Sequence, residues 1–336
     1  MTTAAPALSV EGLSVEFRTR SGIVRALDNV SFAVDKGETI ALVGESGSGK
    51  SVTAYAVMGI LDPAGKVTGG RAMLGGLDLL AAKPSQFADV RGREIAMIFQ
   101  NPRTALNPIR TVGRQIADVL IRHGNVPRRN APAQAIDMLR AVGITDPARR
   151  AAAYPFEMSG GMCQRVMIAI ALAAKPSLLI ADEPTTGLDV TTQAVIMDLV
   201  NDLAKEMGMA TLFITHDLAL AGQRSARIVV MHAGHVVENA PTEELFNHPR
   251  HPYTAELIAA TPDSATSLDE LASIPGSLPD LRRTDLPPCR YSERCPRKTD
   301  ACAQSLPRST SASGHMVACR NPLPGRVADA PTESAA

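Results

Sequence analysis

The sequence predicts an α/β fold in which a mostly parallel sheet carries helices on both faces. Between about residues 8 and 240, short apolar runs typical of buried strands alternate with longer segments of helical periodicity. The apolar run Thr39–Val43 leads into a glycine-rich loop, and a helical segment begins directly after it. Strand, tight loop and helix in this order are the unit from which parallel sheets are built.

Composition limits the function classes that remain. The 336 residues include 34 basic and 34 acidic side chains, so the chain lacks the basic excess of a nucleic-acid-binding surface, and we expect no nucleic-acid partner. Residues 1–10 contain neither the basic segment nor the apolar core of a signal peptide. The longest apolar candidate, Val166–Ala181, is interrupted by Lys175 and Pro176. It is therefore expected to be helix, turn and strand rather than a membrane span.

The individual elements follow from their periodicity. Residues 1–7 are expected to be disordered. Alternating apolar residues over 8–17 and 24–34 predict strands of an N-terminal antiparallel β subdomain. Further strands are expected over 69–80, 94–100, 178–181 and 211–215 and, as a pair, over 227–237. Helices are expected over 111–123, 131–142, 147–153, 162–174 and 189–207, and those within about 101–158 form an inserted helical subdomain.

The glycine-rich loop matches the phosphate-binding P-loop, G-x-x-x-x-G-K-[ST], in its expected context. Glycines let successive backbone N–H groups point into one concavity, and the helix N-terminus adds partial positive charge. Lys50 would reach the β- and γ-phosphates of a nucleotide, and the Ser51 hydroxyl would bind Mg²⁺. The predicted nucleotide-binding residues of this loop are Gly44, Glu45, Ser46, Gly47, Ser48, Gly49, Lys50, Ser51 and Val52.

A second acidic motif follows the apolar run that starts at Leu178. Asp182 and Glu183 stand at the end of this predicted strand. In a P-loop ATPase, Asp182 would hold Mg²⁺, directly or through water, and Glu183 would polarise the attacking water. Ser159, Gly160 and Gly161 open an apolar helix with free N–H groups, which predicts a second anion-binding position.

Composition changes beyond Pro241. We expect a main domain over 8–245, a separate C-terminal domain over 246–320 and a disordered tail over 321–336. Four of the five cysteines fall between 289 and 319, with the spacing C-x₅-C-x₆-C-x₁₆-C. Four thiolates can bind Zn²⁺ or an iron–sulfur cluster. The wide spacing favours a cluster, and zinc or unligated thiols remain as alternatives.

Taken together, the motifs resemble those of the ATP-binding-cassette (ABC) ATPases over about residues 8–240. The resemblance depends on six motifs in the family's order: the P-loop, Gln100 after an apolar strand, Met158–Met162, Asp182-Glu183, Gly187-Leu188-Asp189 and Ile214–Asp217. It implies a P-loop ABC-type core and a head-to-tail dimer that encloses two ATP molecules. It also implies that Ser159, Gly160, Gly161 and Met162 bind the γ-phosphate held by the other subunit, and that Asp189 pairs across the dimer.

The resemblance assigns further roles around the reacting phosphate. Gln100 would contact Mg²⁺ and the attacking water, and His216 would contact the γ-phosphate. Mg²⁺ would then be held by Ser51, Gln100 and Asp182. Three positions depart from the family pattern: Met158 and Met162 bound the signature motif, and Cys163 stands where a basic residue is common. The adenine-stacking position falls near Ser21, which cannot stack, and Phe17 is the nearest aromatic residue.

The region after residue 246 is similar to the C-terminal region of oligopeptide/dipeptide importer ATPases, and in particular to their D-type subunit. The matching stretches are His251–Thr254, Ile274–Gly276, Cys289–Pro296 and Gly314–Cys319. Relatives with this cysteine pattern carry a [4Fe–4S] cluster, and carry-over points to Cys289, Cys295, Cys302 and Cys319 as its ligands.

The partners implied by this family are an F-type ATPase subunit, two membrane-spanning permeases and an extracytoplasmic peptide-binding protein. The chain would then lie at the cytoplasmic face of the plasma (inner) membrane, associated with it through the permeases. A nickel importer shares the same C-terminal region and remains an alternative, as does a soluble ABC ATPase without a transport role.

Overall fold

The computed structural model describes residues 5–186, 190–261 and 273–325. Among these, the chain forms two compact units. The helical unit comprises residues 5–7, 35–38, 82–186 and 190–212, and the P-loop unit comprises 8–34, 39–81, 213–261 and 273–325.

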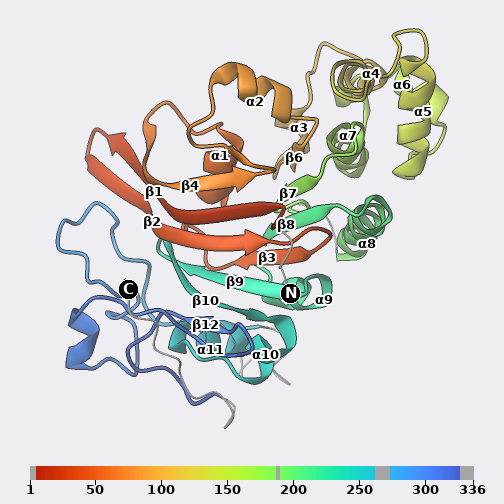
Figure 1. Ribbon diagram of the computed structural model, residues 1–336. Helices are drawn as coiled ribbons and strands as arrows, with labels where there is room; N and C mark the ends of the chain where they lie inside the picture. Colours follow the sequence, from red (N-terminus) through yellow and green to blue (C-terminus); the bar gives the residue numbers. More distant parts are fainter. Residues whose placement is uncertain (1–4, 187–189, 262–272, 326–336) are drawn as a thin grey trace. The chain divides into compact units, whose positions relative to one another are not determined.

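The P-loop unit begins with an antiparallel sheet. Its strands are β1 (Leu8–Thr19), β2 (Gly22–Val34), β4 (Gly65–Leu74) and β5 (Leu77–Asp78), in the order β2-β1-β4-β5 (Figure 1). Alternate apolar residues of β1 are fully buried, including Leu13 and Val15, so one face of this sheet covers a core. The N-terminal antiparallel β region expected from the alternating pattern is confirmed.

A second sheet completes the P-loop unit. β3 (Thr39–Val43) runs parallel to β9 (Arg227–His232), and β10 (His235–Pro241), β12 (Met316–Val317) and β11 (Ser309–Thr310) extend it antiparallel. Its helices are α1 (Lys50–Met58), α9 (Leu218–Arg224), α10 (Thr242–Asn247) and α11 (Pro252–Ala259), with a 3₁₀ turn at Asp300–Ala303. Because β12 pairs with β10, the chain after residue 273 is integrated into this unit.

The helical unit contains the parallel pair β6 (Ile95–Ile98) and β7 (Leu178–Asp182). Part of β8 (Ala210–Thr215) also belongs to it. Its helices are α2 (Pro84–Val90), α3 (Pro102–Ala105), α4 (Val112–Arg122), α5 (Ala131–Ala141), α6 (Pro147–Ala151), α7 (Gly160–Leu172) and α8 (Val190–Met207), with a 3₁₀ turn at Pro155–Glu157. Figure 1 shows α4, α5 and α6 grouped beside α7.

The apolar stripes of these helices explain the grouping. α4 buries Val112, Ile116 and Leu120 at intervals of four, and α5 buries Ala135 and Leu139 in the same way. The helix α7 is apolar nearly all round, and most of its residues are buried. The helices expected over 111–123, 131–142, 147–153, 162–174 and 189–207 are confirmed. Each observed end lies within two residues of the predicted one.

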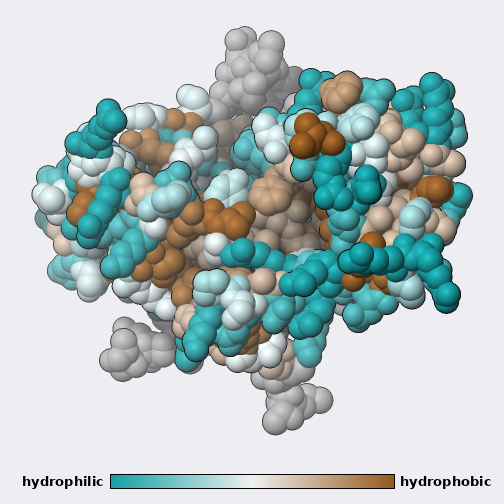
Figure 2. Space-filling view, turned by 90° about the horizontal axis from the view of Figure 1, so that it is seen from above, coloured by the Kyte–Doolittle hydropathy of each residue, from teal (hydrophilic) through white to brown (hydrophobic). Residues whose placement is uncertain are grey.

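No helix within the described ranges is long and apolar enough to cross a bilayer. On the face drawn in Figure 2, hydrophobic residues form small patches separated by hydrophilic side chains. A few large apolar side chains are nevertheless well exposed, and the two most exposed, Ile109 and Phe156, both belong to the helical unit.

Candidate ATP site

The P-loop connects β3 to α1, and its backbone depends on glycine. Gly44 has φ +150°, and a Cβ added there would lie 2.1 Å from the carbonyl oxygen of Met231. Gly49 is the N-cap of α1 at φ +105°, where a Cβ would lie 2.6 Å from the Leu27 side chain. Any larger residue would displace backbone at Gly44, so the loop can approach β9 this closely only because Gly44 has no side chain.

Inside the loop, a cation and an unsatisfied hydroxyl are buried together. The Lys50 side chain is only 5% exposed, and its Nζ donates to the carbonyl oxygens of Gly44 (2.7 Å) and Glu45 (3.1 Å). The Ser48 hydroxyl is fully buried and has no hydrogen-bond partner among the described residues. The buried Ser48 hydroxyl is a polar group that a bound phosphate would satisfy.

Two predicted catalytic residues meet at the ends of neighbouring strands. Gln100 follows β6 and Glu183 follows β7, its parallel neighbour. The Glu183 carboxylate accepts hydrogen bonds from Gln100 Nε2 (2.9 Å) and Thr186 Oγ1 (2.8 Å). Glu183 also has φ +45°, a left-handed conformation that costs a non-glycine residue of order 1 kcal/mol. Asp182 precedes it and is 1% exposed.

The predicted signature motif forms the start of α7. Ser159 is the N-cap, with its hydroxyl accepting from the Met162 N–H at 3.3 Å. A Cβ added to Gly160 would meet nothing within 4 Å, so open space lies in front of this helix end. That space is a pocket of about 490 Å³ lined by Gln100, Asn101, Pro102, Arg103, Gly160, Gln164 and Thr186.

The remaining predicted site residues are distributed between the units. His216 is exposed directly after β8, ahead of Asp217, whose carboxylate accepts from the Leu220 N–H at 2.9 Å and caps α9. It shares the P-loop unit with Ser51, whereas Gln100 and Asp182 belong to the helical unit. The magnesium ligand set therefore stays a prediction. Asp189, with the motif that precedes it, lies outside the described residues.

The adenine-stacking residue also stays unassigned. Phe17 is half-buried in β1, where its ring packs against Gly65; a Cβ added at Gly65 would lie 2.7 Å from the ring. Ser21 is exposed in the turn between β1 and β2.

The structure also brings together residues that sequence reasoning did not connect. The Glu45 carboxylate, in the P-loop, forms a forked ion pair with Arg294 at 2.8 and 3.0 Å, and the Glu45 N–H donates to the Tyr253 hydroxyl at 3.0 Å. Both partners stand in the C-terminal stretches singled out above. Their distance from Glu45 along the chain, 208 and 249 residues, left no local signal for the contact.

The four C-terminal cysteines converge. Cys289, Cys295, Cys302 and Cys319 all line one small, enclosed pocket beneath Tyr291. Burial, reinforced by the neighbouring thiols, raises the pKa of Cys289 to about 11, and burial also raises the pKa of Cys295 and Cys319. Burial therefore disfavours the thiolate form of these three side chains. Among the described residues, no group of three or more His, Cys, Asp and Glu side chains is arranged so that it could hold a metal ion.

Comparison with known proteins identifies the class first. Residues 27–186 match the family model described as ABC transporter. The ATP-binding cassette MJ0796, solved as a dimer bound to ADP and Pi, superposes with a TM-score of 0.63 at 27% identity, covering 70% of this chain and 98% of that one. The fold and the motif set are thus those of an ABC-type ATPase, and the expected fold class is confirmed.

The C-terminal region narrows the class further. Residues 237–302 match the family model described as Oligopeptide/dipeptide transporter, C-terminal region. The dipeptide transport ATP-binding protein DppD of Escherichia coli (strain K12) is 45% identical over 94% of this chain and 97% of its own length. The oligopeptide transport ATP-binding protein AppD of Bacillus subtilis (strain 168) is 44% identical over 93% and 95%. The chain belongs to this family of ABC transporter ATP-binding proteins with an oligopeptide/dipeptide-type C-terminal region.

Proposed function

We propose that the chain is the ATP-hydrolysing subunit of an ABC importer for oligopeptides or dipeptides. The observation that carries this proposal is one chain in which an ABC-type phosphate loop is joined to a C-terminal region of the oligopeptide/dipeptide type. The relatives over nearly the full length are named for dipeptide and oligopeptide transport. ATP binding would close a dimer of cassettes, and hydrolysis would reopen it.

The chemistry is assigned to the predicted residues. The P-loop, from Gly44 to Val52, would hold the phosphates, with Lys50 on the β- and γ-phosphates. Mg²⁺ would be bound by Ser51, Gln100 and Asp182. Glu183 would orient and deprotonate the attacking water, and the hydrogen bond from Gln100 already fixes its carboxylate. His216 would contact the γ-phosphate.

The signature motif would act on the partner's nucleotide. Ser159, Gly160, Gly161 and Met162 would bind the γ-phosphate held by the other subunit, and Asp189 would pair across the dimer. The open space in front of Gly160 and the N-terminal end of α7 suit an anion that comes from outside the chain.

The helical unit offers a surface for the permeases. Ile109 and Phe156 are 82% and 74% exposed, and Tyr154 stacks on Phe156 with ring centroids 5.5 Å apart. Large exposed apolar side chains of this kind anchor protein–protein contacts. We assign them to the permease interface, together with the turn-rich segment 101–110. A second, F-type ATPase and an extracytoplasmic peptide-binding protein would complete an assembly at the cytoplasmic face of the inner membrane.

For the domain organisation we infer an ABC ATPase domain over 8–245, with its helical subdomain near 101–158, and a C-terminal domain over 246–320. The disordered termini expected over 1–7 and 321–336 lie mostly outside the described residues.

For the four-cysteine pocket we propose a [4Fe–4S] cluster held by Cys289, Cys295, Cys302 and Cys319, with zinc as the alternative. When bound, the cluster would cross-link segments that have little apolar core of their own. Anaerobic purification followed by iron and sulfide analysis tests this. We expect about four of each per chain, retained in Cys163→Ser and lost in Cys302→Ser. Zinc without iron would support the alternative, and a metal-free protein would reject both.

Co-purification from membranes with a tag on this chain tests the transport role. We expect two multi-spanning permeases and a second cassette ATPase, and the associated binding protein would distinguish a peptide from nickel as cargo. Recovery of a lone soluble homodimer would leave the ATPase chemistry standing and remove the transport role.

A further inference from the structure

The C-terminal region carries three sequence stretches that ATP hydrolysis by an ABC cassette does not by itself require. These are the segment around Tyr253, the turn Ile274–Gly276 and the segment from Cys289 to Cys295. In the structure two of them contact one P-loop residue, Glu45, and the third contacts Arg294, which binds Glu45; every contact lies within the P-loop unit.

The segment that ends at Cys295 supplies the strongest contact. Arg294 is 5% exposed at its side chain and binds both carboxylate oxygens of Glu45, which is 28% exposed. The guanidinium is itself fixed, because its Nε donates to the Pro275 carbonyl oxygen at 2.7 Å and its Nη1 lies 3.3 Å from His232 Nε2. Burial lowers the pKa of His232 to about 3, so its ring is neutral and Nε2 can accept.

The segment around Tyr253 supplies the second contact. The Tyr253 hydroxyl accepts the Glu45 backbone N–H at 3.0 Å, and the Tyr253 ring is fully buried against Tyr291 and His232. Glu45 is thus held at its main chain by one C-terminal segment and at its side chain by another.

The third stretch acts through Arg294 and through direct packing. Pro275 provides the carbonyl that orients the guanidinium. A few residues later, the Leu278 side chain lies against Gly47, since a Cβ added to that glycine would be 3.3 Å from Leu278 Cδ1. The C-terminal region therefore contacts the P-loop at both Glu45 and Gly47.

Glu45 also connects this contact to the phosphate-binding lysine, because its carbonyl oxygen accepts from Lys50 Nζ at 3.1 Å. Displacing Glu45 would move one of the two carbonyls that bind the ammonium. We propose that Arg294 is a positioning residue for ATP binding. It fixes the Glu45 side chain while Tyr253 fixes the Glu45 main chain, and together they hold the P-loop in the conformation that binds ATP. This inference rests on the proposed function, because it takes the P-loop as the ATP site.

The test is the dissociation constant of ATP for the full-length chain. Replacing Arg294 by Met removes a forked, charge-assisted contact and should weaken ATP binding on the order of ten-fold. Arg294→Lys keeps the charge and should recover part of the loss. In the assembled transporter, KM for ATP should rise by a similar factor while kcat changes little, because the hydrogen-bond partners of Arg294 are Glu45, Pro275 and His232, none of which is assigned to the hydrolysis step.

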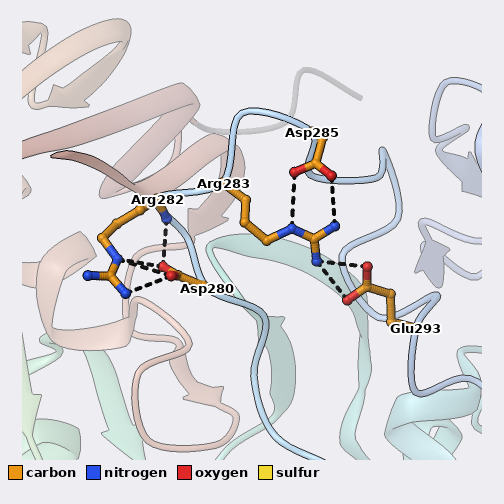
Figure 3. A network of polar contacts seen from close by, with 5 residues as sticks. All are labelled: Asp280, Arg282, Arg283, Asp285 and Glu293. Carbon is orange, nitrogen blue, oxygen red and sulfur yellow. Dashed lines mark hydrogen bonds and ion pairs between the residues drawn. The ribbon is translucent and has the colours of Figure 1, made fainter. Parts of the chain in front are cut away.

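A matched control comes from the same region. Arg282 forms an equally forked pair with Asp280, but it is 47% exposed and has no contact with the P-loop among the interactions described (Figure 3). Arg282→Met should leave the dissociation constant unchanged. Arg283 is less suitable, because it binds Glu293, the neighbour of Arg294 (Figure 3).

A double-mutant cycle separates positioning from general destabilisation. If Arg294 acts through Glu45, Glu45→Ala should add no further loss in an Arg294→Met background. Additive losses, or an unchanged dissociation constant in Arg294→Met, would overturn the inference. Lys50→Ala tests the proposed function separately: normal ATP binding in that variant would remove the P-loop as the ATP site, whatever Arg294 does.

Discussion

Glu183 combines three features that suit a residue aimed at a reacting water. It follows a buried strand, it takes a left-handed backbone conformation, and its carboxylate is oriented by Gln100 and Thr186. A strained conformation held by its neighbours is common where an enzyme needs one orientation of a side chain.

Glu183→Gln should therefore keep ATP binding and lower kcat by roughly 10²–10⁴-fold, since a general base contributes about that much. Equilibrium binding of ATP and the release of phosphate are the two measurements. Undiminished hydrolysis in this variant would remove Glu183 from the catalytic role. Thr186→Val is the milder comparison, because it removes the Thr186 hydroxyl as a donor to the carboxylate and leaves the base in place.

Gly44 shows why the phosphate loop needs glycine for space as well as for conformation. Gly44→Ala would place a methyl group 2.1 Å from the Met231 carbonyl oxygen, so we expect ATP binding to be lost and the free energy of unfolding to fall by more than about 2 kcal/mol. Gly75→Ala is the control, since Gly75 also has positive φ, +54°, but nothing lies within 4 Å of its added Cβ. It should cost only about 1 kcal/mol. Equal losses of stability and binding in the two variants would contradict a steric role for Gly44.

At the scale of elements, the longer helices and buried strands were predictable and most short helices were not, although α6, with five residues, was expected over 147–153. The helix α4 buries one face at regular spacing over eleven residues, a pattern that predicts a helix from the sequence alone. The helices α9 and α10 contain seven and six residues, too few for such a pattern, and were missed. These short helices depend on tertiary packing. The same holds for the contact between Tyr253 of α11 and the Glu45 N–H of the P-loop.

The exposed apolar side chains of the helical unit lead to a prediction about assembly. Ile109→Ser or Phe156→Ser should leave ATP binding by the isolated chain unchanged, because neither side chain is buried. Recovery of permeases with the tagged chain should fall on the order of ten-fold if these residues anchor that interface. Ile23→Ser is the matched control: Ile23 is 47% exposed but lies on β2 of the P-loop unit. The same loss in all three variants would argue against a localised interface.

The N-cap of α11 gives the protein a specific sensitivity to acid. Burial lowers the pKa of His251 to about 4 and that of His232 to about 3, so both rings are neutral in the folded chain. Between pH 6.5 and about 4 the unfolded chain binds protons that the folded chain does not. Stability is therefore fully present above pH 6.5 and falls as the pH is lowered.

His251→Asn isolates one of these two groups. Asparagine keeps a side-chain acceptor for the Tyr253 N–H, which His251 Nδ1 now receives at 3.1 Å, and it does not titrate. At pH 5 the acid loss should be about 1–2 kcal/mol smaller than in the unchanged chain, measured by denaturant unfolding from pH 7.5 to 4.5. Identical pH profiles for the two proteins would show that His251 is not the responsible group.

For the whole molecule, the sequence predicted the chemistry better than the connections between distant parts. Lys50, Glu183 and Ser159 are recognisable because each belongs to a short motif, and the structure places each at the end of the expected element. The contact between Glu45 and Arg294 has no motif, because the two residues lie 249 positions apart in the chain. Long-range contacts of this kind follow from topology rather than from local pattern.

That same separation has a consequence during synthesis. Glu45 is translated 249 residues before Arg294. At roughly 5–20 residues per second, about 12–50 s pass before the ribosome adds Arg294, the arginine that binds the Glu45 carboxylate. A nascent cassette therefore carries its phosphate loop for most of its translation without the C-terminal partner. If Arg294 positions Glu45 as proposed, nucleotide binding reaches full strength only after the segment around Arg294 has been made and has folded against the P-loop.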